Sequence, residues 1–117
     1  MAIPSELLVA VDAYCNAIVR GDARAAEAFV SAPALPDHRA TMARGAGMGP
    51  FDRAATLARA RVGFQYIVKV RISGAAGRFD LQNRWHETDG TWRIVEIEDL
   101  GMRSPWKKPD EARVNHA

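Results

Sequence analysis

Apolar residues recur at three- and four-residue spacing in the first part of the chain and at two-residue spacing in the last part. The first spacing lines one face of a helix, and the second lines one face of a strand. The period changes near Val62. The pattern therefore predicts helices followed by an antiparallel meander, which is an α+β architecture.

Two helices are expected at the start of the chain. The first runs from Ser5 to Arg20, with Ser5 placed to cap it and Gly21 placed to end it. Asp22 can cap a second helix from Ala23 to about Val30, where alanines favour helix. The apolar face of the first helix is expected to contain Leu7, Leu8, Val11, Cys15, Ile18 and Val19.

The middle of the chain, residues 33–50, is rich in glycine and proline, which break regular structure. Within it, residues 38–44 give a weak signal for a short edge strand. A third helix is expected from Arg53 to Arg61, because its alanines and Leu57 are typical of a closely packed helix and Asp52 can cap it.

Three strands are expected after Val62. The first alternates apolar and polar residues as far as Ile72, and residues 73–77 form a turn. The second covers residues 78–88 and the third runs from Thr91 to about Met102. Between them, Asp89-Gly90 is a strong signal for a two-residue hairpin turn.

The hairpin turn predicts a register. With Thr88 opposite Thr91, Trp85 faces Ile94, Asn83 faces Glu96 and Leu81 faces Glu98. An otherwise apolar face would then contain an amide and two carboxylates. The apolar side chains expected on that face include Phe64, Tyr66, Val68, Val70, Phe79, Leu81 and Trp85.

A carboxyl group in an apolar pocket is a candidate general acid or base, because burial disfavours its charged form. Glu96 and Glu98 are the first candidates, and the alternative is that they reach solvent or pair with arginines. Asn83 could orient Glu96 or contact a substrate oxygen, or be a structural amide. Trp85, Trp92 and Phe64 are expected to form core or cavity wall.

Histidine and cysteine give weaker signals. His38 follows Asp37 in the irregular segment, where it is either a solvated loop residue or a ligand contact near a cavity mouth. His86 is expected on the opposite sheet face, among arginines. Three widely spaced histidines and one cysteine give no metal signature, and no glycine-rich cofactor motif is present. We therefore expect neither a metal nor a cofactor.

Length and charge limit the domain organisation and the kinds of partner to expect. The 117 residues suit one domain, expected over residues 1–106, followed by a polar tail over residues 107–117. The net charge of +2 comes from scattered arginines, which does not favour nucleic-acid binding. No apolar run is long enough to span a membrane, and the start is unlike a signal peptide. With the lone Cys15, this indicates a cytoplasmic protein.

Two segments resemble the nuclear transport factor 2-like superfamily, which includes SnoaL-like cyclases, ketosteroid isomerases and related dehydratases and epoxide hydrolases. Residues 13–29 resemble its opening helix pair, and residues 89–97 are similar to its final strand. The resemblance implies a cone-like curved sheet around helices, a small-molecule cavity and a homodimer through the outer sheet face. In the resembling isomerases a tyrosine donates to a developing oxyanion, a role open here to Tyr14 or Tyr66. The alternative, which we take as the default, is a core tyrosine with its hydroxyl at the rim.

The sequence thus predicts a protein that binds a small, largely apolar molecule. If it is an enzyme, the expected chemistry is cofactor-free proton transfer in an isomerase, cyclase, dehydratase or epoxide hydrolase, with Glu96 as acid or base. The alternative is a non-catalytic ligand-binding accessory or dimerisation subunit.

Overall fold

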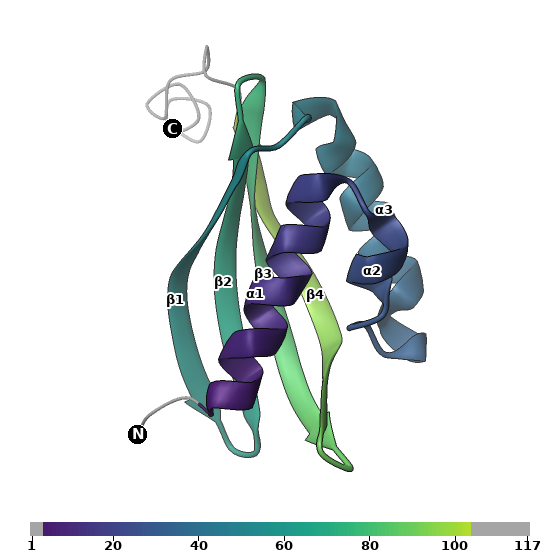
Figure 1. The fold of residues 1–117 in the computed structure, drawn as a ribbon, viewed down its shortest axis with the longest axis vertical. Helices are drawn as coiled ribbons and strands as arrows, with labels where there is room; N and C mark the ends of the chain where they lie inside the picture. Colours follow the sequence, from purple (N-terminus) through teal and green to yellow (C-terminus); the bar gives the residue numbers. More distant parts are fainter. Residues whose placement is uncertain (1–3, 104–117) are drawn as a thin grey trace, which may run out of the picture.

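The computed structural model describes residues 4–103, which form helices packed on one face of a four-stranded antiparallel sheet (Figure 1). The strands follow the order β1-β2-β3-β4 across the sheet. This arrangement confirms the predicted α+β meander. The elements are α1 (Ser5–Arg20), α2 (Ala23–Glu27), α3 (Leu35–Gly45), two short 3-10 helices (Ala32–Ala34 and Ala46–Met48), β1 (Arg53–Val62), β2 (Gln65–Gly74), β3 (Gly77–Thr88) and β4 (Thr91–Arg103).

The opening helix pair follows the prediction closely. Gly21 ends α1 in the left-handed conformation, at φ +74°, which glycine adopts without strain. The Asp22 carboxylate caps α2 by accepting from the Ala25 N–H at 3.0 Å. Ser5 was predicted as the cap of α1, but it is the first helical residue and Pro4 occupies the cap position.

α2 is shorter than predicted because the chain turns toward β4 after Glu27. The Phe29 carbonyl accepts from the Ile94 N–H at 2.7 Å, and the Ser31 N–H donates to the Ile94 carbonyl at 2.9 Å. Val30 thereby forms a parallel bridge with Ile94. The residues predicted as the end of a helix instead tie the helical layer to the sheet.

The middle of the chain contains the two wrong secondary-structure predictions. Residues 38–44 lie in α3 instead of an edge strand, and Arg53–Val62 forms β1 instead of a helix. His38, Thr41 and Gly45 are the buried face of α3, at helical spacing. β1 is a strand because it pairs with β2 along its length, and this tertiary pairing outweighs the helical preference of its alanines.

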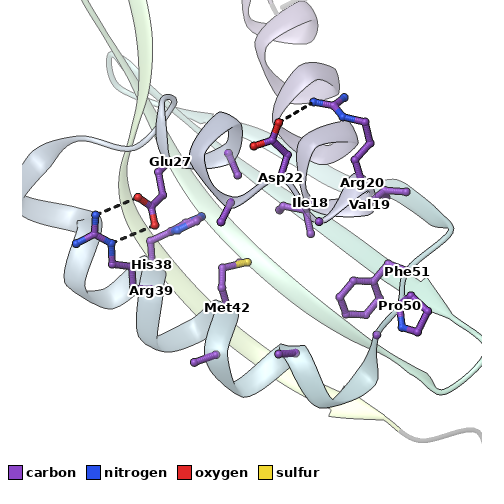
Figure 2. A pocket seen from close by; sticks show the side chains of 16 residues that line it. Ile18, Val19, Arg20, Asp22, Glu27, His38, Arg39, Met42, Pro50 and Phe51 are labelled. Atoms are coloured by element: carbon purple, nitrogen blue, oxygen red, sulfur yellow. Dashed lines mark hydrogen bonds and ion pairs between the residues drawn. The ribbon is translucent and has the colours of Figure 1, made fainter.

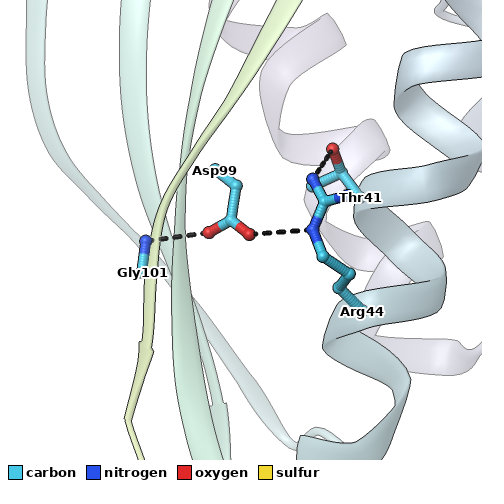
Figure 3. Close-up of polar contacts among 4 residues, drawn as sticks. All are labelled: Thr41, Arg44, Asp99 and Gly101. Carbon is cyan, nitrogen blue, oxygen red and sulfur yellow. Dashed lines mark hydrogen bonds and ion pairs between the residues drawn. The ribbon is translucent and has the colours of Figure 1, made fainter.

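α3 approaches the sheet most closely at its C-terminal end. A Cβ added to Gly45 would lie 2.8 Å from the ring of Phe79, closer than side-chain atoms normally pack. Gly45 therefore allows the helix backbone to rest directly on β3. Arg44 adds a polar contact at the same end, because its Nε donates to Asp99 of β4 at 3.2 Å and its Nη2 donates to the Thr41 hydroxyl at 3.1 Å (Figure 3).

The β3–β4 register is as predicted near the turn and wrong beyond it. Trp85 faces Ile94, but the next pair is Arg84 with Glu96, so Val95 is an extra residue that forms a bulge. Asn83 consequently faces Ile97 instead of Glu96. Because side chains alternate between faces, the bulge moves Glu96 and Glu98 to the outer face of the sheet. The same bulge places Asp99 opposite Leu81, on the helix side where Arg44 meets it, and a second bulge at Leu100 follows.

The core lies between α1 and the inner face of the sheet. Trp85 is its largest fully buried side chain, and the Tyr14 ring meets it edge-on with 5.8 Å between centroids. The Phe29 ring contacts both, at centroid distances of 6.4 Å from Tyr14 and 6.2 Å from Trp85. These ring contacts fix the place of the Tyr14 ring in the core.

Candidate functional site

A cavity of about 590 Å³ lies between the C-terminal end of α1, α2, α3 and the segment before β1 (Figure 2). Its lining is mostly apolar, which is typical of small-molecule sites. The apolar part includes Ile18, Val19, Ala26, Met42, Pro50 and Phe51, and the polar part includes Arg20, Asp22, Glu27, His38 and Arg39.

His38 is the polar group of the cavity wall that connects it to the core. α3 presents His38 on its buried face, so that the residue is 1% exposed. Its Nε2 atom is hydrogen-bonded to the Tyr14 hydroxyl at 2.9 Å. Its Nδ1 atom has no hydrogen-bond partner among the described residues. The imidazole therefore has one nitrogen that is hydrogen-bonded within the protein and one buried nitrogen without a partner among the described residues.

Burial sets the protonation of this pair. It lowers the pKa of His38 below the usual 6.5, an effect that Glu27 opposes and Arg39 reinforces. Burial also raises the pKa of Tyr14 well above 10. At neutral pH the pair is thus a neutral imidazole and a protonated phenol. If Tyr14 donates to Nε2, then Nδ1 carries the proton, and if Nε2–H donates to Tyr14, then Nδ1 accepts.

Asn83 lies behind Tyr14 on β3. It is 1% exposed, and neither its Oδ1 nor its Nδ2 atom has a partner of hydrogen-bonding geometry among residues 4–103. It is near enough to the Tyr14 hydroxyl to oppose the rise in the tyrosine pKa. Its cross-strand neighbours, Val68 and Ile97, offer no polar side chain. Since buried polar atoms are normally paired, Asn83 is an unusual residue in the described core.

Two ion pairs border the cavity (Figure 2). Arg39 of α3 donates twice to the Glu27 carboxylate of α2, at 3.0 and 3.1 Å, and these bonds lower the pKa of Glu27. Arg20 lies 3.8 Å from Asp22. Exposed pairs contribute little stability, but the bidentate pair joins α2 to α3 next to His38. The formal charges of these four residues cancel, so they favour no particular charge on a ligand.

The structure brings together four of the predicted site residues. Tyr14, His38, Asn83 and Trp85 form one buried group, in which His38 lines the cavity and the others lie behind it. Tyr66 and Trp92 pack against each other instead, 5.7 Å apart at their ring centroids. Neither contributes to the cavity lining.

The remaining predicted site residues lie elsewhere. Phe64 is in the β1–β2 turn and 86% exposed, so its predicted place in a cavity wall is wrong. Glu96 is on the outer face, 65% exposed at its side chain and paired with Arg84 at 3.2 Å. Glu98 is exposed on the same face, where Gln82 donates to it at 3.5 Å. The pairing interpretation therefore holds for Glu96, and the reason is the bulge at Val95.

Sequence reasoning missed several cavity residues because it missed α3. Met42 and Arg39 are part of the lining, together with Phe51 from the segment before β1. His38 and Met42 are four residues apart, a spacing that places both on one face once residues 35–45 are recognised as a helix. The alanines and methionine of this segment were the available signal.

The described residues give no support for a metal site, a reactive thiol or a membrane-spanning helix. No group of three or more His, Cys, Asp or Glu side chains within residues 4–103 is arranged to hold a metal ion. Burial raises the pKa of Cys15 to about 12, which keeps it a thiol at neutral pH. None of the helices in this part of the chain is long and apolar enough to span a bilayer.

Comparison with known proteins identifies the fold. No family model matches the chain, and no curated protein matches it. A solved structure does match, that of an NTF-2 like protein of unknown function from Silicibacter pomeroyi, with 20% sequence identity and a TM-score of 0.58. The match covers 83% of this chain and 99% of that one. The chain therefore has the nuclear transport factor 2-like fold.

Proposed function

We propose that the protein binds a small, largely apolar molecule in the cavity beside His38. The observation that carries this proposal is a neutral, buried imidazole in a mostly apolar lining, with its Nδ1 unpaired among the described residues. A small shift that turns the imidazole edge toward the cavity would let a ligand oxygen pair with that nitrogen, while the apolar body of the ligand contacts Met42 and Phe51. The volume of about 590 Å³ is within the usual range for ligand pockets.

A catalytic form of this function is cofactor-free proton transfer, in the manner of an isomerase, cyclase or dehydratase. In this form His38, instead of the predicted Glu96, takes the proton as a neutral imidazole and returns it as the imidazolium. Tyr14 fixes its orientation and tautomer through the 2.9 Å hydrogen bond. Asn83 supports Tyr14 from behind.

The alternative is a ligand-binding accessory protein without turnover. One observation favours it: Glu27, the carboxylate that acts on His38, is already held by two hydrogen bonds from Arg39. Glu27 is therefore engaged by Arg39 and is not free to act with His38 as an acid–base pair. The two forms differ in what His38→Gln does. Turnover is lost and binding is retained if the protein is an enzyme, whereas a binding protein has no turnover to lose.

The binding proposal is tested with a panel of neutral apolar ketones and alcohols, measured by thermal shift and then by calorimetry. Met42→Trp fills the cavity without removing a polar contact, and we expect it to abolish binding. His38→Phe should weaken binding of oxygen-containing compounds more than of their hydrocarbon analogues. Glu98→Gln, on the outer face, is the matched control and should bind as the wild type does. Compounds that bind Met42→Trp unchanged would place the site elsewhere.

We also propose that the protein is a cytoplasmic homodimer, joined through the outer sheet face, which does not bind nucleic acid. Partly buried apolar residues on that face, Ile67 and Val95, support this in a surface that is otherwise polar. Ile67→Arg should then convert the dimer to a monomer in light scattering. A wild-type protein that is monomeric at high concentration would refute the dimer.

A further inference from the structure

β1 is the edge strand of the sheet (Figure 1). Nine of its ten residues are exposed, with Ala54 half-buried. On its other side it meets no further strand within residues 4–103. Helix α1 crosses in front of the sheet in Figure 1, and its contacts with β1 are few beside those between β1 and β2. β1 is therefore held in place chiefly by its pairing with β2.

An edge strand exposes a row of backbone N–H and C=O groups that another strand can pair with. Natural edges are commonly short, charged, bulged or interrupted by proline, which discourages indiscriminate pairing. β1 is ten residues long and contains no proline. It also exposes Leu57 and Val62, which give an added strand apolar contacts. Strand addition to such an edge is a known mode of peptide recognition.

The charge of this edge is positive. β1 contains three arginines and no carboxylate. Lys69 of β2 lies opposite Ala58, one strand in from the edge. Arg61 already donates to the Gly63 carbonyl at 2.9 Å, so the argument rests on Arg53, Arg59 and Lys69. An added strand would lie next to these cations and away from the acidic residues of the outer face.

This charge argues against a second copy of the chain as the occupant. Two β1 strands paired edge to edge would bring Arg53 and Arg59 of both copies together, with no carboxylate on either strand to pair with them. Like charges directly opposite each other destabilise a strand pair, and opposite charges stabilise it. The same arginines that discourage self-association therefore favour an acidic strand.

We propose that the β1 edge binds an extended, acidic segment of another protein, which adds to the sheet as a fifth strand. The bulge at Leu57 defines where its acids lie. Arg53 and Arg59 face Ser73 and Val68 of β2, which are five residues apart and on opposite faces. A regular strand on the other side of β1 would likewise place residues five positions apart opposite Arg53 and Arg59. Two carboxylates five residues apart would then reach Arg53 and Arg59.

The test uses capped synthetic peptides rich in threonine and valine with two glutamates five positions apart, titrated into the full-length protein by calorimetry. A peptide with lysine at both positions is the first control. We expect the glutamate peptide to bind about tenfold more tightly or better than the lysine peptide. Amide shifts in NMR spectra should be concentrated in residues 53–62. Equal binding of both peptides, or no binding of the glutamate peptide, would overturn the proposal.

Charge reversal makes the test specific for this edge. Arg53→Glu/Arg59→Glu should bind the lysine peptide and lose the glutamate peptide, because the pairing is reversed while the backbone edge is kept. Arg59→Glu alone should weaken the glutamate peptide, whereas Arg24→Glu, an equal charge change on α2, should not. Circular dichroism verifies that each variant is folded. Equal losses in Arg59→Glu and Arg24→Glu would indicate a general charge effect and refute strand addition. Dimers that form through β1 would refute it as well.

Discussion

The two faces of the β3–β4 hairpin hold polar side chains in opposite states. On the outer face, Glu96 and Glu98 are exposed and have Arg84 and Gln82 as partners. On the inner face, Asn83 is buried and its amide atoms are unpaired among the described residues. An exposed polar group that already has a partner gains little from a hydrogen bond to a ligand. The inner face is therefore the more informative one about function.

The largest effect should come from the aromatic support of the inner face. Trp85→Ala removes the largest fully buried side chain and leaves a cavity beneath Tyr14. We expect a loss of about 3–5 kcal/mol in the free energy of unfolding, measured by urea titration. Phe64→Ala, an aromatic removed from an exposed turn, is the control and should change stability by less than about 0.5 kcal/mol. Similar losses in both variants would contradict the described packing.

Tyr14→Phe tests the hydrogen bond to His38. The ring remains, but Nε2 of the buried imidazole loses its partner, which should cost about 1–3 kcal/mol in stability. Ligand affinity or turnover should fall together with stability if the pair acts as a unit. An unchanged stability would mean that the Tyr14 hydroxyl contributes no net hydrogen bond.

The pH dependence of stability should reveal His38. Its pKa is lower in the folded protein than in the unfolded chain, so the unfolded state binds more protons below pH 6.5. Stability should therefore decrease as pH falls from 6.5 toward the folded pKa, and the imidazole contribution should be intact above 6.5. Urea titrations of wild type and His38→Gln at pH 7.5 and 5.5 measure this. The variant should lose less stability over that interval, and equal losses would exclude His38 as the titrating group.

Asn83→Leu should separate stability from function. Replacing an unpaired buried amide by an apolar group of similar size should leave stability unchanged or raise it by up to about 1 kcal/mol. Ligand binding should weaken, because Tyr14 loses the side chain behind it. A loss of more than about 1 kcal/mol would show instead that the amide is satisfied in solution.

The smallest effect is expected on the outer face. Glu96→Gln removes one charge of an exposed pair with Arg84 and should change stability by less than about 1 kcal/mol. Ligand binding and any turnover should be unaffected, since this side chain lies across the sheet from the cavity. A large loss of activity in this variant would return Glu96 to the mechanism and break the comparison between the faces.

Much of the fold could be predicted because its signals are local. Gly21 ends α1 and Asp22 caps α2, and the alternation of apolar and polar residues after Val62 predicts the strands. The errors at α3 and β1 have a common origin, since both segments are rich in alanine and arginine and their state depends on which neighbour they meet. With α3 missed, His38 was expected in a loop. The predicted β3–β4 register was wrong beyond Val95, because the residues around this bulge give no sequence signal for it.

The bulges of β4 also bear on how much its length can vary. Val95 and Leu100 are residues of β4 without a counterpart on β3. A chain lacking Val95 would keep Glu96, Ile97 and Glu98 opposite the same residues of β3, and would lose only the local bend. A chain lacking Ile97 would instead exchange the faces of the residues around it. Within β4, insertions and deletions are thus harmless at the bulges and disruptive between them, so distant homologues are expected to differ in length at Val95 and Leu100.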